Sequence, residues 1–223
     1  MNSLKFYFLL IFLSIVNVVF GSLFQTGKVI YINGDVKTGF LAIPKKVDAK
    51  FIEFKSGMGN NQIEKIQSSE LKYVSVQSED GTDFIFERIS YASKLGAKPK
   101  KPVWLFTVLT GYATLYMTSP EYVTDEKGRV ILQYSYYAGT DVPSYNYFIK
   151  KGNEDIAYYF GMTGGSNILG LNSFLRKVAT PYLVDYPELV ERIKNKEFTH
   201  KEYKGIVQLY NEYMKELKPI EKL

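Results

Sequence analysis

The chain has 223 residues, a formal net charge of +5, one histidine and no cysteine. The absence of cysteine excludes disulfides and thiolate metal sites, and a single histidine excludes a zinc site built from several imidazoles of one chain. Acidic and basic residues are interspersed along the sequence, which is typical of a solvated surface rather than a nucleic-acid groove. We therefore expect no nucleic-acid partner, no metal site and no cofactor.

Residues 1–21 have the layout of a secretory signal peptide. Lys5 lies near the amino terminus, an apolar run extends from Phe6 to Phe20, and the small residues Gly21 and Ser22 follow. A bilayer-spanning helix needs about 20 apolar residues, so this run is short for a permanent anchor. We predict cleavage near Gly21-Ser22, export to the periplasm or the extracellular space, and no stable membrane span afterwards. The alternative is an uncleaved segment that anchors the protein in the membrane.

Residues 22–92 show the alternation of short β-strands. Polar and apolar residues alternate around Val29 to Tyr31, and Asn33-Gly34 then favours the positive φ angles of a hairpin turn. Similar short runs follow, separated by turn residues such as Asp80-Gly81. Closely spaced short strands joined by hairpins predict a small antiparallel β module, or partial barrel.

Residues 93–102 read SKLGAKPKKP, and the prolines and lysines of this stretch predict a linker. Residues 103–223 begin with apolar and tyrosine-rich strands, which predict a second antiparallel sheet. After Gly161 the hydrophobic period changes from 2 to about 3.6 residues, which predicts three helices. Asp185 with Glu188, and Thr199 with Glu202, predict capping boxes at the second and third helix. The expected fold class is α+β, with the helices packed on the second sheet.

Several short motifs resemble a group of uncharacterised exported proteins of Bacteroidota. They are the run from Gly27 to Asp35, the strand that starts at Gly111 and ends in Leu115-Tyr116, and a helical tail containing Tyr182, Asp185, Pro187, Ile206, Tyr210 and Asn211. The resemblance implies an exported protein with this layout and assigns no activity. The first block is also similar to the start of Sm-like and SH3-like small barrels.

Tyrosines are concentrated in the strands of the second sheet. A tyrosine has a large apolar body and a polar tip, so exposed rows of it suit the binding of sugars or proteins, although packing between strands is the more common role. The candidate ligand-binding residues are Tyr134, Tyr136, Tyr137, Tyr145 and Tyr147.

Catalytic sets are not evident. His200 is predicted to be a solvated residue in the first turn of a helix. The paired carboxylates lie at predicted hairpin tips, where turn chemistry explains them; they are Glu79-Asp80 with Asp83, Asp125-Glu126 and Glu154-Asp155. The glycine-rich run from Gly161 lacks the lysine of a phosphate-binding loop and is interpreted as a connection.

These features predict a non-enzymatic protein of the cell envelope, which binds an envelope protein or a glycan through the tyrosine-rich sheet. One alternative is a carboxylate-dependent hydrolase of envelope polymers, which requires two carboxyl groups facing each other across a cleft. Another is a structural or assembly component of the envelope.

Overall fold

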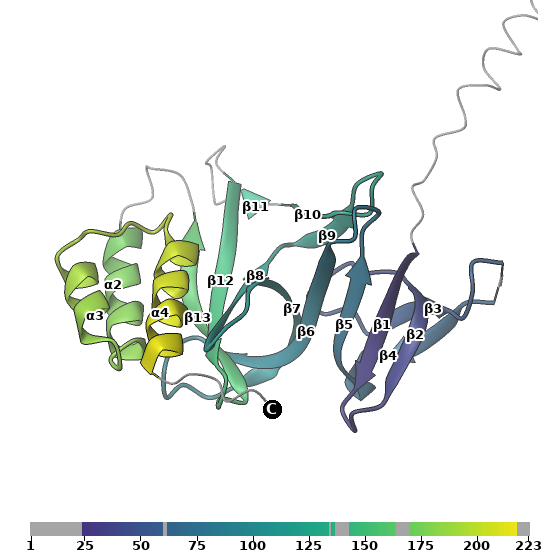
Figure 1. Cartoon of the computed structure of the whole chain (residues 1–223), viewed down its shortest axis with the longest axis horizontal. Coiled ribbons are helices and arrows are strands. Elements are labelled where there is room, and N and C mark those ends of the chain that lie inside the picture. Colours follow the sequence, from purple (N-terminus) through teal and green to yellow (C-terminus); the bar gives the residue numbers. More distant parts are fainter. Residues whose placement is uncertain (1–23, 60–61, 134, 137–142, 164–169, 218–223) are drawn as a thin grey trace, which may run out of the picture.

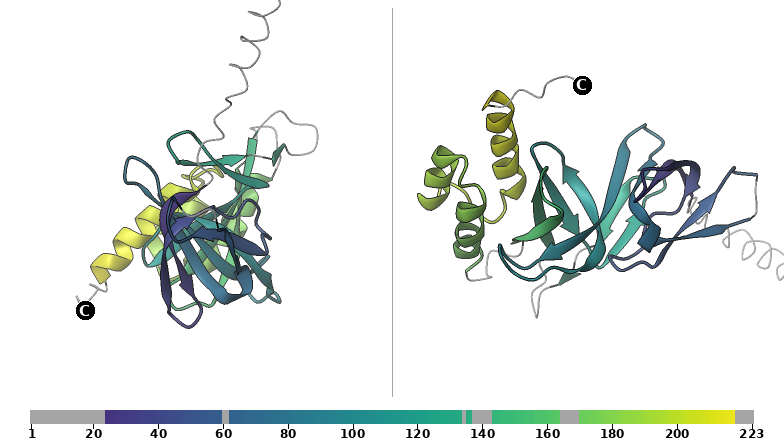
Figure 2. Two further views of the ribbon diagram at one scale, coloured as in Figure 1. Left: turned by 90° about the vertical axis from the view of Figure 1, so that its right-hand side faces the viewer. Right: turned by 90° about the horizontal axis from the view of Figure 1, so that it is seen from below.

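The computed structural model describes residues 24–59, 62–133, 135–136, 143–163 and 170–217. Within these ranges the protein is α+β, consisting mostly of strands followed by three helices, as the sequence predicts. Figure 1 shows three regions side by side: the N-terminal strands, a barrel-like sheet in the middle, and the helices at the opposite end. Figure 2 shows the same succession from below.

Most of the strands are short. They are β1 (Gln25–Tyr31), β2 (Val36–Leu41), β3 (Phe51–Lys55), β4 (Glu64–Gln67), β5 (Leu71–Gln77), β6 (Asp83–Ala92), β7 (Lys100–Leu109), β8 (Ala113–Thr118), β9 (Glu121–Thr124), β10 (Val130–Gln133), β11 (Ser135–Tyr136), β12 (Pro143–Lys151) and β13 (Ile156–Thr163). The helices are α2 (Leu171–Tyr182), α3 (Pro187–Lys194) and α4 (Tyr203–Leu217), and a short 3-10 turn spans Ser68–Glu70.

The first hairpin forms as predicted. β1 pairs antiparallel with β2, and the turn between them places Gly34 at φ +94°. The backbone N–H of Asp35 donates to Asn33 Oδ1 at 3.0 Å, the local bond that makes asparagine a good turn residue. β1 also pairs with β5, so it occupies the interior of the N-terminal part of the sheet.

Five strands close into a barrel-like sheet. β6, β7, β8 and β12 are antiparallel neighbours in that order, and β13 pairs with both β12 and β6. Because five strands that alternate in direction begin and end with the same direction, the closing pair between β13 and β6 must be parallel, and it is. β9 and β10 form a second, two-stranded sheet beside it.

The stretch 93–102, expected to be a linker, contains the turn between β6 and β7 and the first residues of β7. β6 and β7 pair with each other, and β6 also pairs with β5, so the strands before and after this stretch belong to one continuous sheet. Pro102 is tolerated because it lies close to the start of β7, where the register with β6 shifts between Ile89 and Tyr91. The prolines thus mark an irregular strand start.

The buried cluster inside the barrel takes one side chain from each of its five strands, and partly buried neighbours pack against it. The five buried side chains are Ile89, Leu105, Tyr116, Phe148 and Ala157, on β6, β7, β8, β12 and β13 in that order. The outer face of the barrel packs on the helices at one end and on the N-terminal strands at the other, where the single tryptophan, Trp104, is fully buried.

α4 is joined to the barrel by a side chain that imitates a strand. Asn211 Nδ2 donates to the carbonyl of Ala113 at 2.9 Å, and its Oδ1 accepts the N–H of Ala113 at 2.7 Å. A Cβ at Gly111 would overlap the Asn211 amide, so glycine is required there for the helix to approach. The motif that starts at Gly111 and the helical motif that contains Asn211, which are far apart in the sequence, are therefore in direct contact in the fold.

The two predicted capping boxes differ in outcome. The second prediction holds only for the contact: the carboxylate of Glu202 accepts bonds from the N–H and the hydroxyl of Thr199, but α4 begins at Tyr203, so the pair closes the turn before the helix instead of capping it. The first prediction is wrong. α3 begins after Tyr186 with no side-chain cap, because the Asp185 carboxylate faces β12 instead.

Candidate functional site

The barrel is closed along only part of its seam. β13 pairs with β6 at three positions, Ile156 with Ser90, Ala157 with Tyr91 and Tyr158 with Ala92. After Ala92 the chain leaves the sheet, whereas β13 continues to Thr163. Among the described residues, no strand pairs with the remainder of β13 on that side, and α2 packs against this strand.

A crevice lies where this seam, α2 and the turn after β6 meet. Its volume is about 280 Å³, close to the lower end of the roughly 300–1,000 Å³ that is usual for ligand pockets. The lining residues come from four elements of the chain, and they are Ser93, Lys94, Leu95, Ile149, Tyr158, Tyr159, Phe160, Phe174, Lys177, Val178, Pro181 and Tyr182.

The aromatic walls of the crevice are held by contacts between rings. Tyr159 and Phe174 have their ring centroids 5.6 Å apart, and those of Tyr158 and Tyr182 are 5.7 Å apart. Phe160 and Tyr182 belong to the core between the barrel and the helices and are almost completely buried. Fixed rings of this kind provide a preformed apolar surface, so little conformational entropy would be lost when a ligand binds.

Two cations lie at the edge of the crevice. Lys94 and Lys177 are exposed, and within the described residues neither ammonium group forms an ion pair. None of the described residues that line the crevice is acidic. The crevice therefore combines an apolar interior with a positive rim.

Behind the crevice, a polar network ties β12 to the helices. The hydroxyl of Tyr182 donates to Glu154, whose carboxylate also accepts the N–H of Lys151 at 2.8 Å. The Lys151 ammonium binds both oxygens of Asp185, at 3.0 and 2.9 Å, and Tyr210 donates to the same carboxylate at 2.7 Å. All polar groups of this network have partners, which identifies it as a structural junction.

Burial and neighbouring charge shift the pKa values in this network. Burial, followed by the bond to Glu154, raises the pKa of Tyr182, and burial with the bond to Asp185 raises that of Tyr210. Burial alone would raise the pKa of Asp185, but the bonds from Tyr210 and Lys151 and the lysine charge outweigh it and lower that pKa. The tyrosines therefore stay neutral and the Asp185 carboxylate stays charged at neutral pH.

We expect Asp185→Asn to destabilise the protein by about 1 kcal/mol at pH 7, a value reduced because the Asp185 side chain is 39% exposed. The folded-state pKa of Asp185 is depressed, so its contribution is present above the unfolded pKa of about 3.9 and is lost as the pH falls through the folded value. Urea unfolding of the wild type and the variant should therefore differ at pH 7 and converge below pH 4. Asp155→Asn, an exposed carboxylate near the same turn, is the control. A gap between wild type and Asp185→Asn that is unchanged at low pH would contradict the ion pair.

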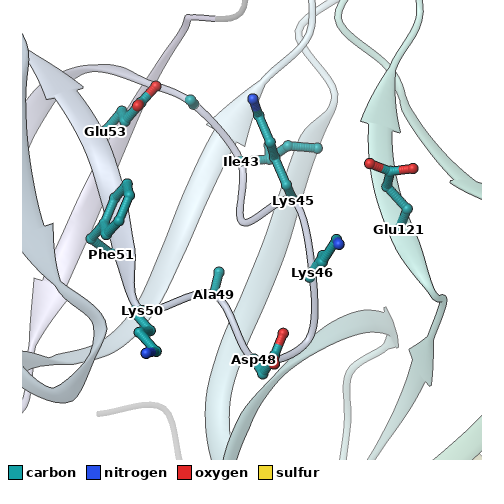
Figure 3. A pocket seen from close by; sticks show the side chains of 10 residues that line it. Ile43, Lys45, Lys46, Asp48, Ala49, Lys50, Phe51, Glu53 and Glu121 are labelled. Carbon is teal, nitrogen blue, oxygen red and sulfur yellow. The ribbon is translucent and has the colours of Figure 1, made fainter.

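A second hollow, of about 320 Å³, lies beside the connection between β2 and β3 (Figure 3). The connection is held across the sheet, because the N–H groups of Trp104 and Tyr122 donate to its carbonyls, each at 2.8 Å. Three lysines and three acids line it: Lys45, Lys46, Lys50, Asp48, Glu53 and Glu121. Figure 3 shows Glu121 facing the connection from β9. Because its positive and negative side chains balance, this hollow favours neither an anionic nor a cationic ligand. Among its described lining residues only Phe51 is aromatic, so it is less suited to a specific small ligand than the crevice.

The predicted tyrosine site is only partly within the described residues. Tyr134 and Tyr137 lie outside them, and Tyr136 belongs to β11. The hydroxyl of Tyr145 donates to the carbonyl of Leu132 at 3.2 Å. Tyr147 is half-buried and stacks on Tyr203 of α4 with ring centroids 4.9 Å apart. The role of the five tyrosines in binding stays a prediction, and Tyr145 and Tyr147 also take part in packing.

The tyrosines of β13 belong to the same tyrosine-rich strands in the sequence but are not among the five candidate ligand-binding residues. Tyr158 and Tyr159 lie in the crevice, opposite Phe174 and Lys177 of α2. Their alternation in a strand-like run was visible in the sequence. The packing of that strand against α2 could not be predicted, because no local sequence pattern specifies it.

The prediction for His200 is wrong. It is buried, at 7% exposure, and Asn172 Oδ1 contacts both its backbone N and its Nδ1 at 2.8 Å. The loop before α4 folds back onto the start of α2, so the histidine joins two helices. A surface position was expected because a first helical turn normally faces solvent.

The predicted hairpin acids mostly serve their own turns. Asp80 accepts bonds from the Ser78 hydroxyl and the Thr82 N–H, and the Ser78 bond is the largest of the effects that lower its pKa to about 2. Asp125 accepts the N–H groups of Lys127 and Arg129. No group of three or more potential metal ligands occurs within the residues that the structure describes.

Across the described ranges, no helix combines the length and the apolar character needed to cross a membrane. The resemblance to exported proteins of Bacteroidota stays a prediction. No family model, no curated protein and no solved structure matches the chain.

Proposed function

We propose that this is an exported, non-enzymatic binding protein whose ligand enters the crevice between β13 and α2. The observation that carries the proposal is the apolar, aromatic hollow of about 280 Å³ at the incomplete seam of the barrel. Concave apolar surfaces with a few convergent polar groups are the usual form of ligand sites. The proposal keeps the predicted binding role and places it on tyrosines of β13.

The chemistry around the crevice supports binding rather than hydrolysis. A carboxylate-dependent hydrolase needs two carboxyl groups across the cleft, and the part of the lining that the structure describes includes none. The nearby carboxylate of Glu154 is already bonded to Tyr182 and to the N–H of Lys151. It therefore holds the floor of the crevice in place instead of facing its interior.

A photo-crosslinking experiment tests the proposal. Replacing Phe174 by p-benzoylphenylalanine places a reactive ketone at the crevice wall, and irradiation of the cells that produce the protein should capture a small molecule. Intact mass spectrometry should show a discrete added mass on the chain, and the same spectrum reports whether the mature protein begins at Ser22.

Lys204 provides the matched control, because it is exposed on α4 and lies outside the crevice. The same substitution at Lys204 should capture no discrete small molecule. Equal labelling at both positions, or no adduct at Phe174, would contradict a ligand site in the crevice. A captured protein at Phe174 would favour the alternative of an assembly component.

A further inference from the structure

We infer that the ligand of the crevice is a small organic anion with an apolar body, such as a short fatty acid. The inference rests on the proposed function and adds the chemical class of the ligand. Three properties of the lining support it: the charge at the rim, the character of the walls and the size of the hollow.

The charge at the rim is of one sign. Lys94 follows β6 and Lys177 lies on α2, so two elements far apart in the sequence each bring a lysine to the same opening. Both are free of ion pairs within the described residues, in contrast to Lys151, whose ammonium is bound by Asp185. An anionic group at the opening would gain two favourable interactions without competing with a carboxylate of the lining.

The walls select an apolar body. Besides the lysines, the lining includes the apolar side chains of Leu95, Phe174, Val178 and Pro181 and the almost fully buried Phe160. Leu95 is 42% exposed although it is a large aliphatic residue. An alkyl chain or a single ring would cover this surface, and each buried CH₂ contributes about 0.8 kcal/mol.

The size of the hollow excludes large lipids. At about 280 Å³ it is small even among pockets for drug-sized molecules. A single chain or ring fits this volume, whereas the two acyl chains of a membrane lipid would extend far into solvent. The occupant is therefore a free, single-chain or single-ring anion.

Isothermal titration calorimetry of the purified full chain with octanoate, octan-1-ol and octylammonium tests the inference. The three probes share one chain and differ in charge. Octanoate should bind at least about tenfold more tightly than octanol, and octylammonium more weakly than octanol, with the advantage of octanoate shrinking as salt is added.

Two sets of variants locate the effect. Lys94→Gln with Lys177→Gln should reduce octanoate affinity to that of octanol and leave octanol unchanged. Lys98→Gln with Lys101→Gln removes the same charge from exposed positions outside the lining and should change neither. Leu95→Trp, which places an indole at the opening, should weaken all three probes.

The outcomes separate this inference from the proposed function. Equal binding of octanoate and octanol, or an unchanged octanoate affinity in the Lys94/Lys177 variant, would overturn the anionic class. Failure of every probe to bind would also overturn it, while an adduct at Phe174 in cells would still support a ligand site. A neutral or cationic adduct would keep the proposed function and reject the ligand class.

Discussion

Replacing Gly161 by alanine is expected to destabilise the protein by about 3 kcal/mol. Gly161 has φ +146°, a conformation that residues with a side chain rarely adopt, and this costs on the order of 1–3 kcal/mol. A Cβ at this position would also overlap the hydroxyl and ring of Tyr203. Tyr203 is 1% exposed and stacks on Tyr147, so it has no free space into which to move.

Urea unfolding followed by the fluorescence of the buried Trp104 would measure this effect. Gly170→Ala is the matched control, because Gly170 also has a positive φ, +91°, but no atom of the described residues lies within 4 Å of a Cβ placed there. The control should lose only the backbone contribution, about 1 kcal/mol. Equal losses in the two variants would show that Tyr203 does not pack against β13 in solution.

Gly161 also illustrates what the sequence allows to be predicted. The change of hydrophobic period after it, from 2 to about 3.6 residues, is a local pattern and predicts strands followed by helices, although β13 continues past Gly161 to Thr163. The turn at Asn33-Gly34 and the spacing of α2, α3 and α4 are likewise properties of neighbouring residues. Elements and the α+β class were predictable for this reason.

Contacts between distant residues were not predictable in the same way. The pairing of β13 with β6 joins Ala157 to Tyr91, and nothing in either strand specifies the other. The same holds for Asp185, whose sequence neighbourhood indicates a helix cap and whose partner in the structure is Lys151. Because the crevice exists only where β13, α2 and the turn after β6 meet, its residues could not be assembled from local patterns.

The glycines show a further limit. A Cβ at Gly39 would overlap the ring of Phe54, and one at Gly27 would overlap the backbone of β5. Gly39 makes room for an aromatic ring of the next strand, and no residue beside it in the sequence specifies that ring. A glycine within a strand indicates that another group approaches closely, but only the fold shows which residue approaches.

The second large loss of stability is expected from a pair of charged side chains inside the barrel, where the alternation of polar and apolar residues predicts apolar ones. Lys150 and Glu87 form an ion pair at 2.8 Å, with side chains 17% and 19% exposed, and the hydroxyl of Tyr116 donates to the same carboxylate. These residues continue the inward-facing positions of Phe148 and Ile89 on their strands. Each charge is thus stabilised chiefly by the other.

Lys150→Met is expected to destabilise the protein by about 2–3 kcal/mol, because it leaves the Glu87 carboxylate without its counter-charge in a largely buried position. Glu87→Leu should lower the stability by a similar amount, because it leaves the Lys150 ammonium without its counter-charge. Lys194→Met, which removes an exposed pair with Glu191, should change stability by less than about 0.5 kcal/mol and serves as the control.

The decisive measurement is the combined variant, Lys150→Met with Glu87→Leu and Tyr116→Phe, compared with the single variants by urea unfolding. Removing both charges and the hydroxyl together leaves no unpaired polar group, so most of the lost stability should return. Strongly non-additive losses would establish that the three side chains act as one buried unit that joins β6, β8 and β12. Additive losses would mean that the lysine and glutamate are solvated separately at the barrel opening, and that apolar packing alone holds the barrel closed.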